Sequence, residues 1–475
     1  MNTRPSDEKA MGAEETDLKK GGVATDRTEI DPVLDKRITR QLDNHILPWI
    51  FILWLLAFID RSNIGNAKLD GLATELHLTG DKYNIALTVF YILYVLIDIP
   101  ANWALKHVGG GHWLAMIAIA WGIVGTCMGA VKSYGGLIAC RLLLGACEGG
   151  MFGGIILYVS SRRRSGAFGG LLATALAQIK FHGYNGWPWI FFVEGALTIV
   201  VASVAFFFLP HTPAKCAFLT PEEQWHAAHR LRIDLYGAAN AETVEEEHFT
   251  WLAVRHAFFN VNTIAMSINF FIILVPIYSF SLFLPSIISG LGYKAVHAQL
   301  LTVPPNFLAF LTVLGSSWIS DKIKMRGPMI LVGASLAAIG YIMQLASHHP
   351  GIKYGGTFFV AAGAFPCSPL VLAWLSNNLA PHYIKATGLG LQVAIGNCGA
   401  FVATFTYLAQ DAPNYITGHA INLGAIGLIL IITAANMAYI RWENAARASG
   451  KRDYRLQQGP EELLGYRHPE FRYTM

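Results

Sequence analysis

Long apolar stretches alternate with short polar segments along most of this chain. A helix needs about 20 apolar residues to cross the hydrocarbon core of a bilayer, and by that measure the pattern predicts twelve membrane-spanning helices. The first six are expected near residues 47–67, 83–105, 112–131, 135–159, 166–181 and 188–209. The other six are expected near residues 260–290, 298–319, 328–347, 354–376, 387–409 and 417–440.

A polar central segment separates these spans into two groups of six. We therefore expect an all-α membrane protein built from two similar halves, a layout that recurs in secondary transporters. The halves are assigned to residues 46–210 and 257–441, with a cytoplasmic loop over residues 211–256 between them. A disordered cytoplasmic tail is predicted over residues 1–45, and a second cytoplasmic tail over residues 442–475.

The fifth predicted span is shorter than a bilayer requires. Its apolar run, GAFGGLLATALAQI, has 14 residues, and only residues 159–165 separate it from the fourth span. Runs of 10–14 apolar residues are more typical of buried or re-entrant segments than of complete spans. We expect the cytoplasmic part of this span to be missing.

Basic residues in the loops predict the orientation. Cytoplasmic loops of membrane proteins carry an excess of lysine and arginine, and here basic clusters such as Arg162–Arg164 fall on the same side as both tails. The opposite loops hold scattered single lysines, including Lys68 and Lys82. Both termini are therefore predicted to be cytoplasmic.

Composition agrees with a lipid-embedded chain and argues against several other classes of protein. Hydrophobic residues make up 53% of the chain and charged residues only 14%, against about a quarter in soluble domains. The net charge of +4 gives no indication of a nucleic-acid partner. The six cysteines have neither zinc-site nor redox-motif spacing, and the histidines of the central loop lack regular ligand spacing. We expect no metal, no cofactor and no ATP-binding loop.

The strongest chemical signal is the pair Asp60 and Arg61 inside the first span. Charges within a membrane are costly and usually face a cavity that handles ions or substrate. In a helix Asp60 and Asn63 share one face, while Arg61 points roughly 100° away. A cavity carboxylate can exchange protons, and an arginine fork suits a substrate carboxylate. The alternative is an internal ion pair that only fixes the helix.

A second group of polar residues lies in the fourth span, in CRLLLGACEGGMFGG. Arg141 and Glu148 are seven residues apart, so both face the same side of a helix. Glu148 is expected to relay protons, and Arg141 to tune the Glu148 carboxyl or contact an anion, with a structural interhelical bond as the alternative for Arg141. Gly145, Gly149 and Gly153 are spaced for close contact with another helix.

Weaker candidates lie elsewhere. In the first half Asp98 is interpreted as structural, Glu194 as a packing or interface residue, and Tyr91 and Tyr94 as candidate cavity hydroxyls. Polar residues of the second half are candidates for substrate contact, although amides also join helices: Asn377, Asn378, Gln392 and Asn397. Asp321 and Arg326, at a predicted cytoplasmic helix end, suit a latch between conformations.

Several motifs together resemble the anion:cation symporter family of the major facilitator superfamily, and in particular its fungal allantoate, nicotinate and pantothenate permeases. The resemblance covers nearly everything from about Asp35 onward. It rests on FIDRSNIGNAKL, the R-x6-EGG pattern of Arg141–Gly150, WPWIFFVEG, SLFLPSIISGLGY, LLTVPP, WLSNNLAPHYIKATGLGLQVAIGN and the tail LGYRHPEFRYTM.

The resemblance implies proton-coupled uptake of a small organic anion by alternating access at the plasma membrane, in a monomer. By motif, Asp60 and Glu148 resemble the family's proton-handling carboxylates, Arg61 its anion ligand and Arg141 the basic partner of Glu148. Tyr94 and Gln392 match positions on the substrate side of the cavity.

Two departures from the family pattern bear on function. Glycine stands at position 153, where the family usually has proline, and SSRRRSGAFGG replaces a longer stretch between the fourth and fifth spans. The shortened span keeps open a second interpretation, a nutrient sensor or inactive isoform that binds ligand without transport. An enzyme is disfavoured, because no nucleophile–base set appears in the sequence.

Overall fold

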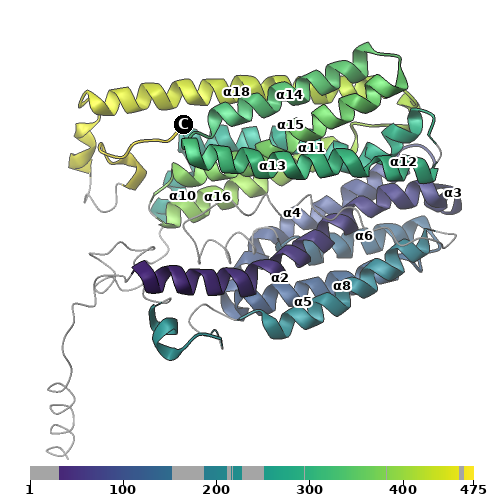
Figure 1. Cartoon of the computed structure of the whole chain (residues 1–475), viewed down its shortest axis with the longest axis horizontal. Helices are drawn as coiled ribbons and strands as arrows, with labels where there is room; N and C mark the ends of the chain where they lie inside the picture. The colour runs from purple at the N-terminus through teal and green to yellow at the C-terminus, as the bar shows by residue number, and fades with distance from the viewer. Residues whose placement is uncertain are drawn as a thin grey trace, which may run out of the picture.

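The computed structural model describes residues 32–151, 187–210, 216, 218–226, 251–293, 295–380, 382–458 and 465–475. The described residues form two layers of long helices (Figure 1), with the first half of the chain in purple to blue and the second half in green to yellow. The expected fifth span and the end of the fourth span, including Gly153, lie outside the described residues.

Long helices make up most of the described residues of the first half. Its elements are α2 (Pro32–Ala67), the π-helical turn η1 (Lys68–Leu72), α3 (Ala73–Glu75), α4 (Lys82–Val108), α5 (Gly110–Met128), α6 (Tyr134–Glu148) and α8 (Pro188–Phe208). Gly109 joins α4 to α5 with a φ of 91°, which a residue with a side chain rarely adopts. The Ser133 side chain caps α6 by accepting a hydrogen bond from the Gly136 amide at 3.2 Å.

The second half repeats this layout and adds an ordered tail. Its elements are α10 (Trp251–Phe258), α11 (Val261–Gly290), α12 (Ala295–Leu301), α13 (Val303–Ile323), α14 (Gly327–Ala346), α15 (Pro350–Asn377), α16 (His382–Asn397), α17 (Gly399–Thr404), η3 (Ala409–Asp411), α18 (Ile416–Ala448), η4 (Asp453–Gln458) and η5 (Gly465–Arg467). Proline occupies the first turn of α13, α14 and α15, where its missing amide costs no hydrogen bond.

Among the described residues, eight helices are long and apolar enough to cross a membrane. Three expectations about their limits need correction. Helix α2 begins at Pro32, so residues 32–45 are helical and not part of a disordered tail. The end of the expected central loop forms α10. The expected span over residues 387–409 is divided between α16 and α17 at Cys398.

Glycines allow α4 and α6 to touch backbone to backbone. A Cβ atom at Gly145 would overlap the carbonyl oxygen of Phe90, and one at Gly149 would overlap that of Tyr94. This contact confirms the predicted close approach of the fourth span to another helix for the two glycines described. It also fixes Glu148, on α6, close to the tyrosines of α4.

The two halves meet at the end of the bundle that carries η1, which we call the η1 end (right in Figure 1). The Asn84 side chain donates to the carbonyl of Thr404 at 2.6 Å, and the Thr88 and Thr404 hydroxyls lie 2.7 Å apart. Gln299 donates to Asp70 at 3.1 Å. The opposite end carries the carboxyl-terminal residues 465–475 and is called the tail end.

Candidate functional site

An ion pair between Arg61 of α2 and Glu148 of α6 forms the centre of the candidate site. The Nε of Arg61 donates to Oε2 of Glu148 at 2.6 Å, and the Glu148 side chain is fully buried. The guanidinium lies 4.6 Å from the ring centroid of Tyr94 and 5.8 Å from that of Phe90. The aromatic faces of α4 therefore surround a short, charge-assisted hydrogen bond.

Arg141 occupies a different position from the one that the family resemblance implies. Its Nε donates to the carbonyl of Ala86 at 3.4 Å, and its guanidinium lies 5.0 Å from the centroid of Phe90. Among the described residues, the ion-pair partner of Glu148 is therefore Arg61, and Arg141 acts on Glu148 only through its longer-range charge. The bond to Ala86 matches the interhelical alternative for Arg141, and its charge still acts on Glu148 as the tuning role predicts.

Asp60 lies on the other side of α2 and faces α5. Its side chain is 3% exposed and lies next to the indole of Trp121 and the backbone of Gly125. Both guanidiniums, of Arg61 and Arg141, act on this carboxylate through their charges. The predicted separation of Asp60 and Arg61 onto two faces of the helix is confirmed.

Glu194 of α8 belongs to the same site, although its sequence context favours a packing or interface role over a place in a cavity. The Asn63 amide of α2 donates a hydrogen bond to Oε2 of Glu194, and the Glu194 side chain is buried. Glu194 also interacts electrostatically with Asp60 and Glu148. An acidic residue in an otherwise apolar span was the available signal, but its partner lies 131 residues away in the chain.

These side chains form a charge cluster, which we define as Asp60, Arg61, Arg141, Glu148 and Glu194. Three carboxylates face two guanidiniums, so full ionisation leaves one negative charge uncompensated within the cluster. An isolated buried charge is expensive in a low-dielectric interior. One bound proton makes the cluster neutral, which suits a group that takes up and releases protons.

The second half contributes uncharged groups next to this charge cluster. The hydroxyl of Tyr278, on α11, donates to Oδ1 of Asn397 at 3.2 Å. Its ring centroid lies 5.3 Å from that of Tyr91, and Tyr278 interacts electrostatically with Arg61. Tyr278 was absent from the candidates chosen by sequence, because a tyrosine in an apolar span gives no distinctive signal. Asn397 is the predicted second-half residue that the structure brings to the site.

Three other predicted residues lie away from the charge cluster or make packing contacts. Gln392 is buried and donates to the carbonyls of Met266 and Val371 at 3.2 and 3.4 Å, so it joins α16 to α11 and α15. Asn378 binds the backbone of Thr474 in the carboxyl-terminal segment, while Asn377 is exposed at the end of α15.

Asp321 and Arg326 form an ion pair at the tail end, between α13 and α14. Arg326 also donates to the Ser320 hydroxyl at 3.0 Å, and its amide donates to the carbonyl of Met475. The predicted latch residues are thus paired with each other and joined to the carboxyl-terminal segment. No group of three possible metal ligands occurs among the described residues.

Known proteins resemble the chain over nearly its whole length. The model of the Major Facilitator Superfamily matches residues 50–404. An uncharacterized transporter of Schizosaccharomyces pombe is 34% identical over 98% of this chain and 95% of its own. The MFS-type transporter efuF of Hormonema carpetanum is 31% identical over 88% of this chain and 87% of its own. The major facilitator-type transporter hxnP of Emericella nidulans is 29% identical over 98% of this chain and all of its own length.

A solved structure has the same fold. It is the crystal structure of a bacterial homologue of the human lysosomal transporter Spinster, in an inward-facing and unoccupied conformation. The similarity has a TM-score of 0.58 and covers 85% of this chain and 96% of that one, at 15% sequence identity. At this identity the match establishes the arrangement of helices alone.

Proposed function

Since this chain belongs to the major facilitator superfamily, and is therefore a multi-pass membrane transporter and not an enzyme, we propose that it carries a small organic anion inward together with protons. Within the superfamily we assign it to the anion:cation symporters, on the motifs that resemble the fungal permeases. Its substrate is then a carboxylate such as nicotinate, pantothenate or allantoate. We place it as a monomer in the plasma membrane, with both termini in the cytoplasm.

The observation that carries this proposal is the ion pair of Arg61 with Glu148 at 2.6 Å. The guanidinium of Arg61 is the one best placed to hold a substrate carboxylate, but it already donates a hydrogen bond to Glu148. An incoming anion must compete with Glu148 for the same hydrogen-bond donors. Protonation of Glu148 removes its charge and frees the guanidinium, so binding of a proton favours binding of the anion.

Asp60 and Glu194 extend this coupling. Both lie close enough to Glu148 to act on it electrostatically. When the anion binds Arg61, the negative charge of the site increases by one, and a further proton on either carboxylate restores the balance. The site therefore couples the anion to protons through charge balance, with Asp60 and Glu148 as the principal proton acceptors.

The second half completes the substrate site in this proposal. Tyr278 and Asn397 border the charge cluster across the boundary between the halves. Their hydroxyl and amide supply the uncharged hydrogen-bond groups that orient a ligand whose charge is held by Arg61. Because the halves are joined at the η1 end, we assign this conformation to the inward-facing state of an alternating-access cycle.

Transport by the purified protein in liposomes tests the proposal. Radiolabelled nicotinate, pantothenate and allantoate are offered separately, with the external solution acidic relative to the lumen. We expect accumulation of at least one of them. Asp60→Asn and Glu148→Gln should lose accumulation driven by the pH gradient and retain exchange of labelled for unlabelled anion, whereas Arg61→Ala should lose both.

The matched control is Glu470→Gln, which removes an exposed carboxylate of the tail segment. It should transport like the unmodified protein. Full gradient-driven uptake by both carboxylate variants would overturn the assignment of Asp60 and Glu148. Saturable binding of an anion without accumulation by the unmodified protein would instead support the nutrient-sensor interpretation.

A further inference from the structure

Lys68 is a half-buried cation at the η1 end that the proposed transport site does not use. Its ammonium lies 4.2 Å from the ring centroid of Tyr83, the second residue of α4. Among the described residues, the Lys68 side chain makes no hydrogen bond and no ion pair. A partly buried ammonium without a counter-charge is unfavourable, so Lys68 is suited to an anionic partner.

Lys68 is the first of three cations along one face of α4, counted from the η1 end. Arg141 lies 5.0 Å from the centroid of Phe90, and Arg61 lies 4.6 Å from that of Tyr94. The rings of this aromatic face are seven and four residues apart, as one side of a helix requires: Tyr83, Phe90 and Tyr94. At a rise of about 1.5 Å per residue, the face leads roughly 16 Å from Lys68 to Arg61.

Two buried polar groups next to the aromatic face also lack a partner. The hydroxyl of Tyr83 and Nη1 of Arg141 are both buried, and neither has a hydrogen bond within the part of the chain that the structure describes. The two side chains also interact electrostatically. A buried donor without an acceptor is destabilising, and the oxygen atoms of a carboxylate would satisfy both donors.

Contacts between the halves close this route in the present conformation. Tyr83 packs edge-on against Phe283 of α11, with ring centroids 6.3 Å apart, and Asn84 donates to the carbonyl of Thr404 at 2.6 Å. Opening of the η1 end must break these contacts, because they join the first half to the second. The ring of Tyr83, and the Lys68 ammonium above it, then lie at the start of the opened route.

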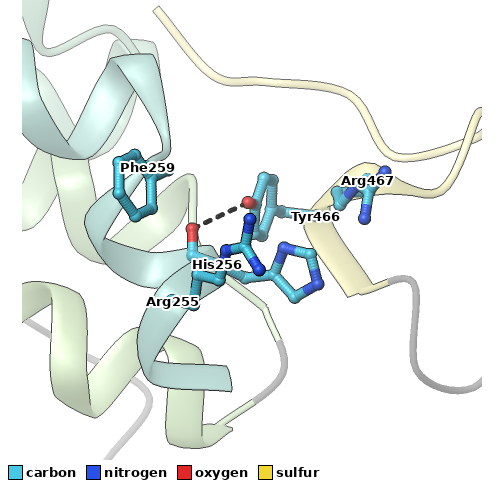
Figure 2. A pocket seen from close by; sticks show the side chains of 5 residues that line it. All are labelled: Arg255, His256, Phe259, Tyr466 and Arg467. Carbon is cyan, nitrogen blue, oxygen red and sulfur yellow. Dashed lines mark hydrogen bonds between the residues drawn. The ribbon is translucent and has the colours of Figure 1, made fainter. Parts of the chain in front are cut away.

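Basic side chains also gather at the tail end, around a cavity that Figure 2 shows. It has a volume of about 430 Å³ and is lined by Arg255, His256, Phe259, Tyr466 and Arg467. The Tyr466 hydroxyl donates to the carbonyl of His256 at 3.0 Å, as the dashed line marks. This cavity therefore belongs to the contact between α10 and the carboxyl-terminal segment. Lys68 lies at the opposite end, where an anion taken up from outside enters in the proposed orientation.

We propose that Lys68 is the first binding site for the incoming anion at the η1 end. The inference rests on the proposed function, in which a small carboxylate enters from this end. The carboxylate pairs with the ammonium above Tyr83 and then moves along the aromatic face to Arg141 and Arg61. The Tyr83 ring holds the ammonium in place. Lys68 therefore assists loading from the η1 end and contributes nothing to loading from the tail end.

Transport kinetics measured from each side of the membrane test this role. Intact cells report loading from the η1 end and inside-out vesicles report loading from the tail end, with whichever of nicotinate, pantothenate and allantoate the unmodified protein accumulates. Lys68→Gln should raise KM from the η1 end about fivefold, with kcat within about twofold, because one charge pair is lost. KM from the tail end should not change. Lys68→Arg keeps the charge and should restore the KM of the unmodified protein.

The matched control is Lys82→Gln, which removes an exposed cation at the same end, 5.7 Å from the ring of Tyr134. It should transport like the unmodified protein. An unchanged KM from the η1 end in Lys68→Gln would overturn the proposal. Equal rises of KM from both ends would also overturn it, because they indicate a general structural defect.

A binding measurement separates this proposal from the proposed function. If the unmodified protein accumulates none of the three anions, the proposed function fails, and the site is tested by acetylation of lysines with an impermeant reagent, followed by mass spectrometry. Slower acetylation of Lys68, but not of Lys82, in a mixture of the three anions would support the site. Equal rates with and without the anions, or no reaction of Lys68, would overturn it.

Discussion

At the scale of single residues, the pairing of opposite charges explains why buried charged side chains are tolerated in the first half. Glu148 would be prohibitively costly alone in an apolar interior, and Arg61 supplies a hydrogen bond and a compensating charge at 2.6 Å. The same pairing makes the two side chains interdependent. Any ligand or proton that engages one of them changes the environment of the other.

Glu194→Gln should uncouple transport from the proton gradient without removing the substrate site. The glutamine keeps an oxygen that can accept from Asn63, so the contact between α2 and α8 persists while one negative charge disappears. We expect the rate of gradient-driven uptake to fall about tenfold or more, because loss of a proton-transfer group typically lowers a rate by at least that factor. Exchange without a gradient, measured in the same liposomes, should stay within about twofold. Unchanged gradient-driven uptake would remove Glu194 from the mechanism.

Adjacent asparagines provide a second prediction with an internal control. Asn378→Ala removes a side chain that donates to the Thr474 carbonyl at 3.0 Å and accepts from its amide at 2.8 Å. Loss of such buried bonds costs about 1–3 kcal/mol, and we expect a lower apparent melting temperature in a thermal unfolding assay. Asn377→Ala, at an exposed position, should melt normally. A KM change in Asn378→Ala without a stability change would restore its predicted substrate role.

Residue-level prediction from the sequence succeeded where a charge contrasts with its surroundings. Asp60, Arg61 and Glu148 stand out in apolar helices, and the structure brings all three together. The partners of Asn378 and Glu194 could not be predicted in this way, because 96 and 131 residues separate them in sequence. Local spacing contains no information about such distant contacts.

At the scale of helices, glycine determines how closely α4 and α6 pack. Gly145→Ala should disrupt this contact, because the added methyl group would overlap the backbone carbonyl of Phe90 and α6 cannot keep its position. We expect a destabilisation of about 3 kcal/mol, at the upper end of overpacking costs. Fluorescence-detected size-exclusion chromatography after heating measures the loss of folded protein.

Gly315→Ala is the matched control for this substitution. Gly315 also lies within a helix, α13, but a Cβ atom there meets nothing within 4 Å. Alanine is the better helix former by about 1 kcal/mol, so this variant should be at least as stable as the unmodified protein. Similar destabilisation of both variants would mean that helix packing is not the reason for glycine at position 145.

The long apolar helices among the described residues were predicted with the correct type and order, because a long apolar run in a membrane chain has few alternatives. Their ends were predicted less well. Helix α2 begins at Pro32, and its first turns are rich in polar residues that the hydropathy pattern assigned to the terminal tail. The break between α16 and α17 falls at Cys398 within an apolar run, where composition does not change.

At the scale of the whole molecule, contacts between the halves close the η1 end. Thr88 of α4 and Thr404 of α17 have hydroxyls 2.7 Å apart, so cysteines at both positions lie within reach of a disulfide. In Thr88→Cys, Thr404→Cys, oxidation should stop transport in liposomes, and reduction should restore it. The single variants control for oxidation of native cysteines and should stay active. Full transport by the oxidised double variant would contradict opening at this end.

The two-half architecture was predicted from the spacing of apolar runs and is confirmed by the fold. How the halves face each other was not predictable, because most contacts described at the η1 end involve uncharged side chains of ordinary polarity, and Asp70 bonds to the uncharged Gln299. Asn84 and Thr88 carry no sequence signal that distinguishes them from packing residues. Their partners in the second half are more than 300 residues away in the chain.

One consequence of the arrangement is electrical. All five side chains of the charge cluster lie on helices of the first half, and the second-half groups described next to them, Tyr278 and Asn397, are uncharged. If the first half moves as one body during the cycle, the cluster crosses the membrane field as a single net charge. Moving one elementary charge across a membrane potential of 100 mV changes its energy by about 2.3 kcal/mol. With one anion and two protons bound, the cluster is neutral and its movement is insensitive to voltage. The empty, fully ionised cluster has one net negative charge, so the return step is the one that responds to the membrane potential.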